Sequence, residues 1–201
     1  MKLNLFRGLL DTFHGYVKSF QSESPVIHTL HRRMLDVTRE VLGMFVKPEC
    51  IPDRVSELLK LDVTDSSIQK SDKDMNVGRY AYTDLNKARL DKTCRYWVKT
   101  LYSDLRKGYV VAAKKILQLP LSNKTLRRLS FLDPVLASHS QTPALLKKQA
   151  DSLPFAVSVE DAGKLAVEAD RYATDLQVKD LVAAHPDGER IDNYWTKVFS
   201  L

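Results

Sequence analysis

The sequence predicts an all-α protein, and more narrowly an elongated helical bundle organised on one long helix. Only seven of the 201 residues are glycine and 44% are hydrophobic, a composition that suits a soluble helical chain better than a barrel or a sandwich. Along most of the chain, apolar residues recur at steps of three and four, which is the period of one helical face. The clearest such segment, 84–119, lies in the longest stretch without proline.

This segment, 84–119, is the expected spine of the bundle. Asp84 can cap its start, Asp91 and Arg95 can pair on its outer face, and Pro120 ends it. A helix of this length would span roughly 50 Å, so other helices must lie along it to cover its apolar stripe. We expect Trp97 near the centre of that stripe, which comprises Leu90, Cys94, Trp97, Val98, Leu101, Leu105, Tyr109, Ala112, Ala113 and Ile116.

Two helices are predicted before the spine. The first, at about 3–20, is amphipathic, and its aromatic residues favour the protein core over a membrane surface. The second starts at the Ser24-Pro25 signal and ends near residue 46, so the short polar link makes the pair an antiparallel hairpin. A short helix, 54–61, completes a first part at 1–61. The polar segment 62–76 is the predicted linker to a second part at 77–201, and we expect the two parts to pack as one unit.

The chain after Pro120 is predicted to form shorter helices. Ser122 is the expected cap of the first, and Ser158 the expected cap of a longer helix that ends near residue 176. Between them, 153–159 is the only strand-like run, and it can equally be an extended connection. The segment 191–201 begins another amphipathic helix, and its apolar end suggests a chain cut from a longer parent.

The charge balance is mildly basic, with 31 Lys and Arg against 25 Asp and Glu and a net charge of +6. This charge fits a nucleic acid or an anionic surface as partner, and it also fits a solvated protein that has neither. Two cysteines, Cys50 and Cys94, are too few for a disulfide framework and indicate a reducing compartment; Cys94 is expected to be a small buried hydrophobe. No apolar run approaches the roughly 20 residues of a membrane span, so no membrane partner is expected.

No residue pattern in the sequence specifies a reaction. It contains no glycine-rich phosphate loop and no nucleophile motif. His28 and His31 are three apart on a helix, but no further ligand pair follows at metal-binding spacing, so we interpret them as structural. We therefore predict no catalytic residue, no cofactor, no metal and no small-molecule ligand.

Basic residues are concentrated between about 95 and 150, and this region is the one candidate binding surface. A stripe of this kind can hold nucleic-acid phosphates, and the alternative is the solvated face of a long helix. Lys147 and Lys148 also fall in this region. The candidate contacts to double-stranded DNA are Arg106, Lys107, Lys114, Lys115, Lys124, Arg127 and Arg128.

Two segments resemble hAT-like, transposase-derived proteins. The first matches an "fQSd.P" element followed by a helix ending in "rFvKp", through Phe20, Gln21, Ser22, Pro25, Leu30, Phe45, Val46, Lys47 and Pro48. The second matches an "LPL.n..L..l..L.P" element, through Leu119, Pro120, Leu121, Asn123, Leu126, Leu132 and Pro134. The segment 191–201 looks like the "D.fW..v" helix of the same proteins.

The resemblance implies that the chain is mainly the helical insertion of an RNase H-like catalytic core. The zinc finger and the C-terminal dimerisation segment of such proteins would lie outside it, and no residue here matches their metal-binding acidic triad. The implied function is a non-catalytic, nuclear fragment with DNA or chromatin-protein contacts. The alternative is a helical adaptor that binds protein partners, or the missing parts of its parent, through 3–20 and 191–201 and has no nucleic-acid role.

Overall fold

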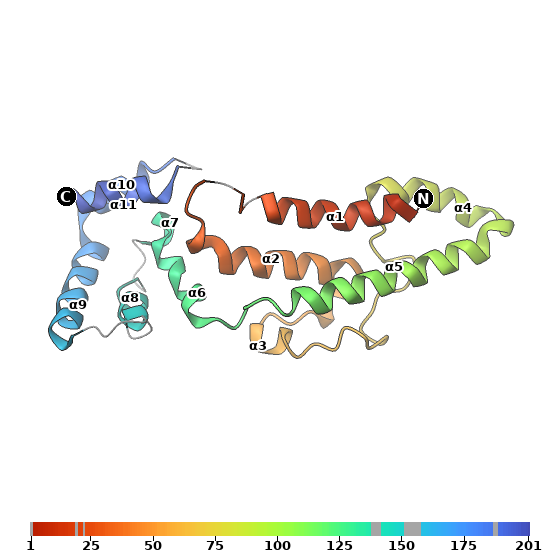
Figure 1. Cartoon of the computed structure of the whole chain (residues 1–201), viewed down its shortest axis with the longest axis horizontal. Coiled ribbons are helices and arrows are strands. Elements are labelled where there is room, and N and C mark those ends of the chain that lie inside the picture. The colour runs from red at the N-terminus through yellow and green to blue at the C-terminus, as the bar shows by residue number, and fades with distance from the viewer. Residues whose placement is uncertain (1, 19, 22, 138–141, 151–157, 187–188) are drawn as a thin grey trace. The chain divides into compact units, whose positions relative to one another are not determined.

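The computed structural model describes residues 2–18, 20–21, 23–137, 142–150, 158–186 and 189–201, and within them it is helical (Figure 1). The described residues contain no strand; one isolated antiparallel bridge joins Val46 to Gln69. The predicted all-α fold class is therefore confirmed. The strand-like run 153–159 lies outside the described residues except at its end, where Val159 begins a helix.

The chain divides into two compact units, each built from two separate segments. Unit 1 comprises 1–21 and 33–122, and unit 2 comprises 22–32 and 123–201. This division differs from the predicted one, because 62–76 lies inside unit 1 and the chain passes from unit 1 to unit 2 after Ser122.

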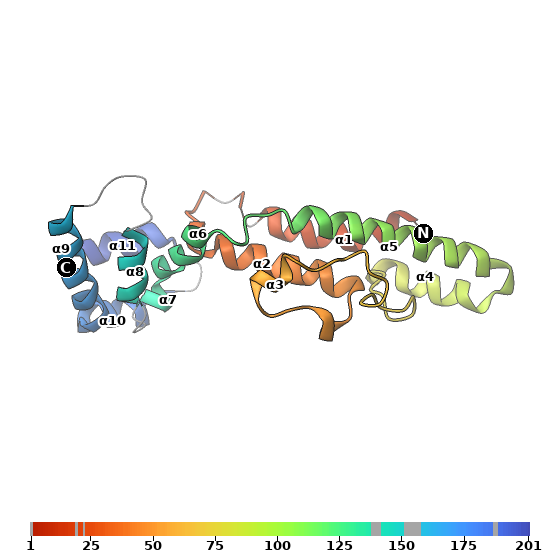
Figure 2. The same ribbon diagram turned by 90° about the horizontal axis from the view of Figure 1, so that it is seen from below.

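Unit 1 is a helical bundle around one hydrophobic core. Its helices are α1 (Lys2–Lys18), α2 (Ile27–Phe45, which belongs to unit 1 from Arg33 onward), η1 (Pro48–Cys50), α3 (Val55–Leu58), α4 (Arg79–Leu90), η2 (Lys92–Cys94) and α5 (Arg95–Ile116). Figures 1 and 2 show α4 and α5 side by side and joined by a tight turn. The predicted hairpin of α1 and α2 is present, with Thr12 donating a hydrogen bond to Glu40 at 2.8 Å. The centre of the core is formed by Val41, Leu42, Phe45, Val46, Leu58, Ala81, Leu85, Leu105, Tyr109 and Ala113.

The predicted spine is two helices and not one. Asp91 has extended backbone (φ −88°, ψ 116°), and its carboxylate accepts hydrogen bonds from the backbone N–H of Thr93 at 2.8 Å and from its hydroxyl at 2.6 Å. This local pairing competes with helix formation, so α4 ends and α5 turns back beside it. Asp84 lies inside α4 and caps nothing. The carboxylate of Asp91 is hydrogen-bonded to Thr93. Among the residues that the structure describes, it forms no ion pair with Arg95, the partner predicted for it.

The break divides the predicted apolar stripe into a buried half and an exposed half. Leu101, Tyr102, Leu105, Tyr109, Ala113 and Ile116 are buried along α5. Leu90 and Trp97, by contrast, are 88% and 69% exposed, and Cys94 is half-buried, with its Sγ 3.6 Å from Asp91 Oδ2. Trp97 is therefore not the centre of the core: half-buried Val98 packs against the core, and the fully buried part of the stripe begins at Leu101.

The segment 62–76 packs against the core and is not a free linker. Val63 and Met75 are 2% and 4% exposed, and the amide of Gln69 donates to Val63 O at 2.8 Å. Backbone hydrogen bonds from Lys47 N to Ile68 O (2.9 Å) and from Lys70 N to Phe45 O (2.7 Å) attach the segment to the end of α2. The many polar residues of this segment predicted that it would be exposed. Its few apolar side chains are nevertheless buried in the core, and their burial holds the segment against unit 1.

Helices α1 and α4 approach closely where two glycines meet. A Cβ atom on Gly8 would lie 2.9 Å from the Cα of Gly78, closer than real Cβ atoms come to a backbone atom. Gly78 has φ 76° and precedes α4, a conformation that side-chain-bearing residues avoid. Both glycines are therefore required by the backbone geometry.

Unit 2 is a set of short helices around an aromatic cluster. Its helices are α6 (Lys124–Arg128), η3 (Leu129–Leu132), α7 (Pro134–Ala137), α8 (Thr142–Ala150), α9 (Val159–Thr174), α10 (Leu176–Ala183) and α11 (Ile191–Phe199), with 22–32 from the N-terminal segment. The ring of Tyr172 stacks on Trp195 at 5.3 Å, and its hydroxyl lies 2.8 Å from that of Tyr194. Trp195 donates its indole N–H to Leu132 O at 3.0 Å, which ties α11 to η3.

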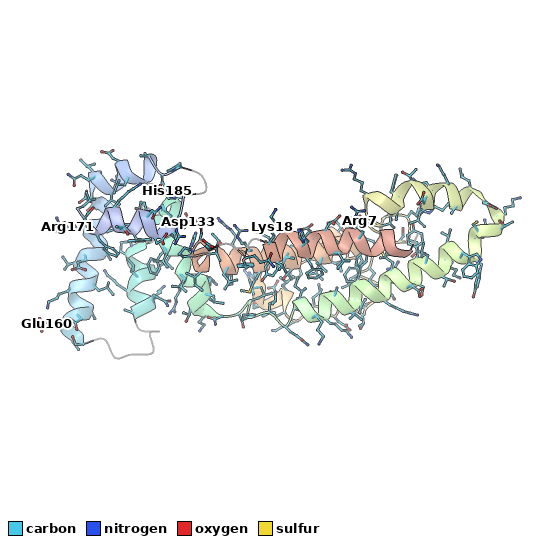
Figure 3. The ribbon with its side chains drawn as sticks, turned by 45° about the horizontal axis from the view of Figure 1, so that its top comes forward. Arg7, Lys18, Asp133, Glu160, Arg171 and His185 are labelled. Carbon is cyan, nitrogen blue, oxygen red and sulfur yellow. The ribbon has the colours of Figure 1, made fainter. Side chains whose placement is uncertain are left out.

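Local signals position two of these helices. The predicted cap Ser158 is confirmed, since its hydroxyl accepts from Asp161 N at 3.0 Å. Figure 3 shows Glu160 and Arg171 toward opposite ends of α9, the arrangement of charges that a helix dipole favours. The predicted cap Ser122 is wrong: Asn123 accepts from Leu126 N at 3.1 Å instead.

Candidate phosphate-binding pocket

A basic pocket lies between α6 and α8 in unit 2. Its volume is about 260 Å³, and its lining consists of four cationic residues and one leucine. The lining residues are Lys124, Arg127, Arg128, Leu145 and Lys148. None of them is acidic, so every charge on this lining has the same sign.

The sequence of α6 places three of these cations together. Asn123 caps the helix, and Lys124, Arg127 and Arg128 follow at helical spacings of three and four, so they share one side of it. The guanidinium of Arg128 also donates to Lys148 O at 2.6 Å. That hydrogen bond joins α6 to α8 and brings Lys148 to the same pocket.

The adjacent lysine of α8 points to a different neighbour. Lys147 Nζ lies 3.5 Å from Asp170 of α9, whereas Lys148 lines the pocket. Consecutive helical residues diverge by about 100°, which explains the two directions. The charge of Lys147 is thus paired, and Lys147 is not one of the residues that line the pocket.

The pocket can hold an anion that has several oxygen atoms. Arginine presents a planar fork that matches phosphate oxygens, and lysine adds a mobile point charge. A volume of about 260 Å³ is below the usual 300–1,000 Å³ of small-molecule sites. The size and charge therefore suit one phosphate group of a longer backbone better than an enclosed small ligand.

The structure separates the seven candidate contacts predicted from the sequence. Lys124, Arg127 and Arg128 come together in unit 2. Lys107, Lys114 and Lys115 are exposed on α5 in unit 1. Lys114 lies near Asp62, whose pKa is lowered chiefly by its hydrogen bonds to Thr64 and, to a smaller extent, by this lysine.

Arg106 is engaged within unit 1, so we do not retain it among the candidate phosphate contacts. Its guanidinium donates to Gln69 Oε1 at 2.9 Å, to Lys70 O at 3.0 Å and to Asp72 Oδ1 at 2.8 Å. These acceptors occupy the fork that a phosphate would need. Arg106 is a structural residue that holds the segment 62–76 on α5.

Lys148 is the pocket residue that the predicted set omitted. Its position in the basic 95–150 region was visible in the sequence, but its partner helix was not. The choice between Lys147 and Lys148 depends on how α8 packs between α6 and α9. That orientation is a tertiary property without a local sequence signal.

The histidine pair of α2 has no metal-site geometry in the described residues. His31 is 8% exposed, and the described part of the chain contains no group of three or more His, Cys, Asp or Glu placed to hold a metal ion. None of the described helices combines the length and the apolar character that crossing a bilayer requires.

No family model, no curated protein and no solved structure matches this chain.

Proposed function

We propose that this protein binds the sugar-phosphate backbone of double-stranded DNA without reading its sequence and without catalysis. The observation that supports the proposal is the all-cationic lining of the pocket between α6 and α8. Neutralising phosphates with Lys and Arg releases counterions from DNA, and this supplies affinity that is independent of sequence.

The net charge of +6 and the exposed lysines of α5 add to this proposal. Lys107, Lys114 and Lys115 form a second cationic surface, the α5 lysine row, which lies in unit 1. We treat it as a separate and weaker candidate, because Lys114 is shared with Asp62. Within the same proposal, the resemblance to hAT-like proteins suggests a nuclear, non-catalytic fragment of a transposase-derived protein.

A binding titration with two unrelated duplexes tests the proposed function. Fluorescence anisotropy of labelled 20-base-pair DNA at 50 mM salt should give the same affinity for both sequences. The triple variant Lys124→Glu/Arg127→Glu/Lys148→Glu should bind at least about tenfold more weakly and lower the slope of log K against log salt by about 1 per lost contact. Arg128 is left unchanged, because its hydrogen bond to Lys148 O supports the fold.

Matched controls separate the pocket from general charge. Lys60→Glu/Lys179→Glu changes two exposed lysines elsewhere, and Lys107→Glu/Lys114→Glu/Lys115→Glu removes the α5 lysine row. The pocket variant should lose more affinity per reversed charge than either control. Equal losses per reversed charge in the pocket variant and the Lys60/Lys179 variant would show an effect of net charge alone, and no binding at 50 mM salt would refute the proposal.

A further inference from the structure

We propose that the turn end of the α4–α5 hairpin is a docking surface for an acidic amphipathic helix of another protein. We define the hairpin tip as residues 87–99. This surface belongs to unit 1 and goes beyond the proposed DNA contact, which rests on unit 2. The proposal stands on exposed apolar side chains, a cationic rim and a fixed turn.

The apolar part of the hairpin tip consists of three large side chains left in water. Leu90 is 88% exposed, Tyr96 73% and Trp97 69%. The rings of Tyr96 and Trp97 contact each other edge-on, with centroids 5.9 Å apart. Removing apolar area from water is favourable, so a partner that covers these side chains gains binding free energy, and Trp and Tyr are frequent binding hot spots.

The same short segment carries four exposed cations, which we call the cationic rim. Lys87, Lys92, Arg95 and Lys99 are all exposed, and none of the four forms an ion pair with any residue that the structure describes. Beside them, a cavity of about 390 Å³ is lined by Arg95, Lys99, Lys73 and Arg89, with Asp72 as its one acid. The charge of the hairpin tip therefore complements carboxylates.

The turn is fixed before any partner arrives. The carboxylate of Asp91 accepts from the N–H and hydroxyl of Thr93. Arg89 donates to Tyr102 Oη at 2.7 Å and to Asp72 O at 3.1 Å, and its guanidinium lies 5.1 Å from the centre of the Tyr102 ring. These contacts join α4 to α5, so a partner would not need to order the turn.

Two other classes of partner fit less well. Bases would stack on Tyr96 and Trp97, but an aliphatic side chain such as Leu90 has no face on which a base can stack. An anionic bilayer would have to accept Asp91 together with Leu90, and the hydrogen bonds from Thr93 lower the pKa of that carboxyl and keep it charged. An acidic amphipathic helix can contact both parts of the hairpin tip. Its apolar residues would pack on Leu90 and Trp97, and its carboxylates would pair with the cationic rim.

Selection from a displayed library of 20-residue helical peptides tests the proposal. The full chain is the bait, and Leu90→Ser/Trp97→Ser is the counter-selection bait. Enriched peptides should carry Asp or Glu on one face and Leu, Phe or Trp on the other. In anisotropy measurements, such a peptide should bind the Leu90→Ser/Trp97→Ser variant at least about tenfold more weakly.

The charge is tested separately with Lys92→Glu/Lys99→Glu, against Lys60→Glu/Lys179→Glu as a control. The first pair should weaken the peptide severalfold and reduce its salt dependence, and the control pair should bind as the parent does. Because Val135 is 72% exposed in unit 2, Val135→Ser controls for the loss of an exposed apolar side chain.

Three results would overturn the proposal. One is that the enriched peptides lack acidic residues, or that none of them depends on Leu90 and Trp97 for binding. Another is that a labelled oligo(dT) binds more tightly than any selected peptide and that the Trp97→Ser variant no longer binds this oligonucleotide. The third is Trp97-dependent binding to vesicles containing 30% phosphatidylserine with no selected peptide binding.

Discussion

Arg106 holds a polar segment of the chain in place with one side chain. Its guanidinium contacts Gln69, Lys70 and Asp72, and the side chain is 26% exposed. Charge-assisted hydrogen bonds of this kind are stronger than neutral ones, and their loss leaves the acceptors to be satisfied by water. The segment 62–76 therefore depends on a residue of α5 far along the chain.

Replacing Arg106 should destabilise unit 1. Arg106→Ala should lower the free energy of unfolding by about 2 kcal/mol, because three hydrogen bonds to its guanidinium are lost. Urea unfolding followed by circular dichroism measures the change. The neighbouring Lys107→Ala, at an exposed position, should stay within about 0.5 kcal/mol of the parent. If the two variants behave alike, Arg106 has no structural role.

Burial of Tyr109 should make stability depend on alkaline pH. Removal from water raises the pKa of Tyr109 from 10.0 to about 12. The unfolded chain therefore ionises first, and the free energy of unfolding should fall between about pH 10 and pH 12. Tyr109→Phe should remove this component of the pH dependence, whereas Tyr96→Phe, at a 73% exposed site, should keep the parent slope. Urea unfolding at several pH values checks both; identical slopes for all three proteins would contradict the assignment.

At the residue scale, the sequence identified cations but not their partners. Arg106 and Lys107 are adjacent and chemically similar, yet one is a structural contact and the other is exposed. Lys124, Arg127 and Arg128 could be grouped in advance because they lie on one short helix. Lys148 could not, since it reaches the pocket only through the packing of α8.

At the scale of elements, aspartates interrupt two helical runs. Asp91 separates α4 from α5, and Asp175 separates α9 from α10 by accepting from Gln177 N at 2.8 Å and Val178 N at 3.4 Å. Both residues offer a carboxylate to N–H groups two or three residues ahead, which starts a new helix. The apolar period that predicted one helix over 84–119 does not register the break at Asp91, because the period continues through it. The end predicted near residue 176, by contrast, lies within two residues of the observed end of α9 at Thr174.

Removing the carboxylate at the α4–α5 turn should destabilise the hairpin. Asp91→Ala loses both hydrogen bonds to Thr93 and should lower the melting temperature by a few degrees. Asp84→Ala removes an exposed aspartate from within α4 and should change the melting temperature little. Differential scanning calorimetry compares the two, and an equal response would mean that Asp91 is not a cap.

At the scale of the whole molecule, the fold class was predictable and the division into units was not. Helical period and low glycine content are properties of local sequence, and they were sufficient for the all-α prediction. The units are assembled from segments that are distant in sequence, including 22–32 with 123–201. The polar segment 62–76 resembled a boundary because its few buried residues, Val63 and Met75 among them, are outnumbered by polar ones.

The interleaved connectivity of the units sets an order of assembly during synthesis. The ribosome delivers 22–32 early, but the rest of unit 2 begins only at Asn123. Translating the intervening residues takes roughly ten seconds at ordinary rates. During that interval Arg32 lacks Asp133, which lies 3.9 Å away in the finished protein, and Glu23 O lacks its donor Arg190. Unit 1 can therefore close on the nascent chain, whereas the last helix to emerge, α11, must return to a segment made near the start.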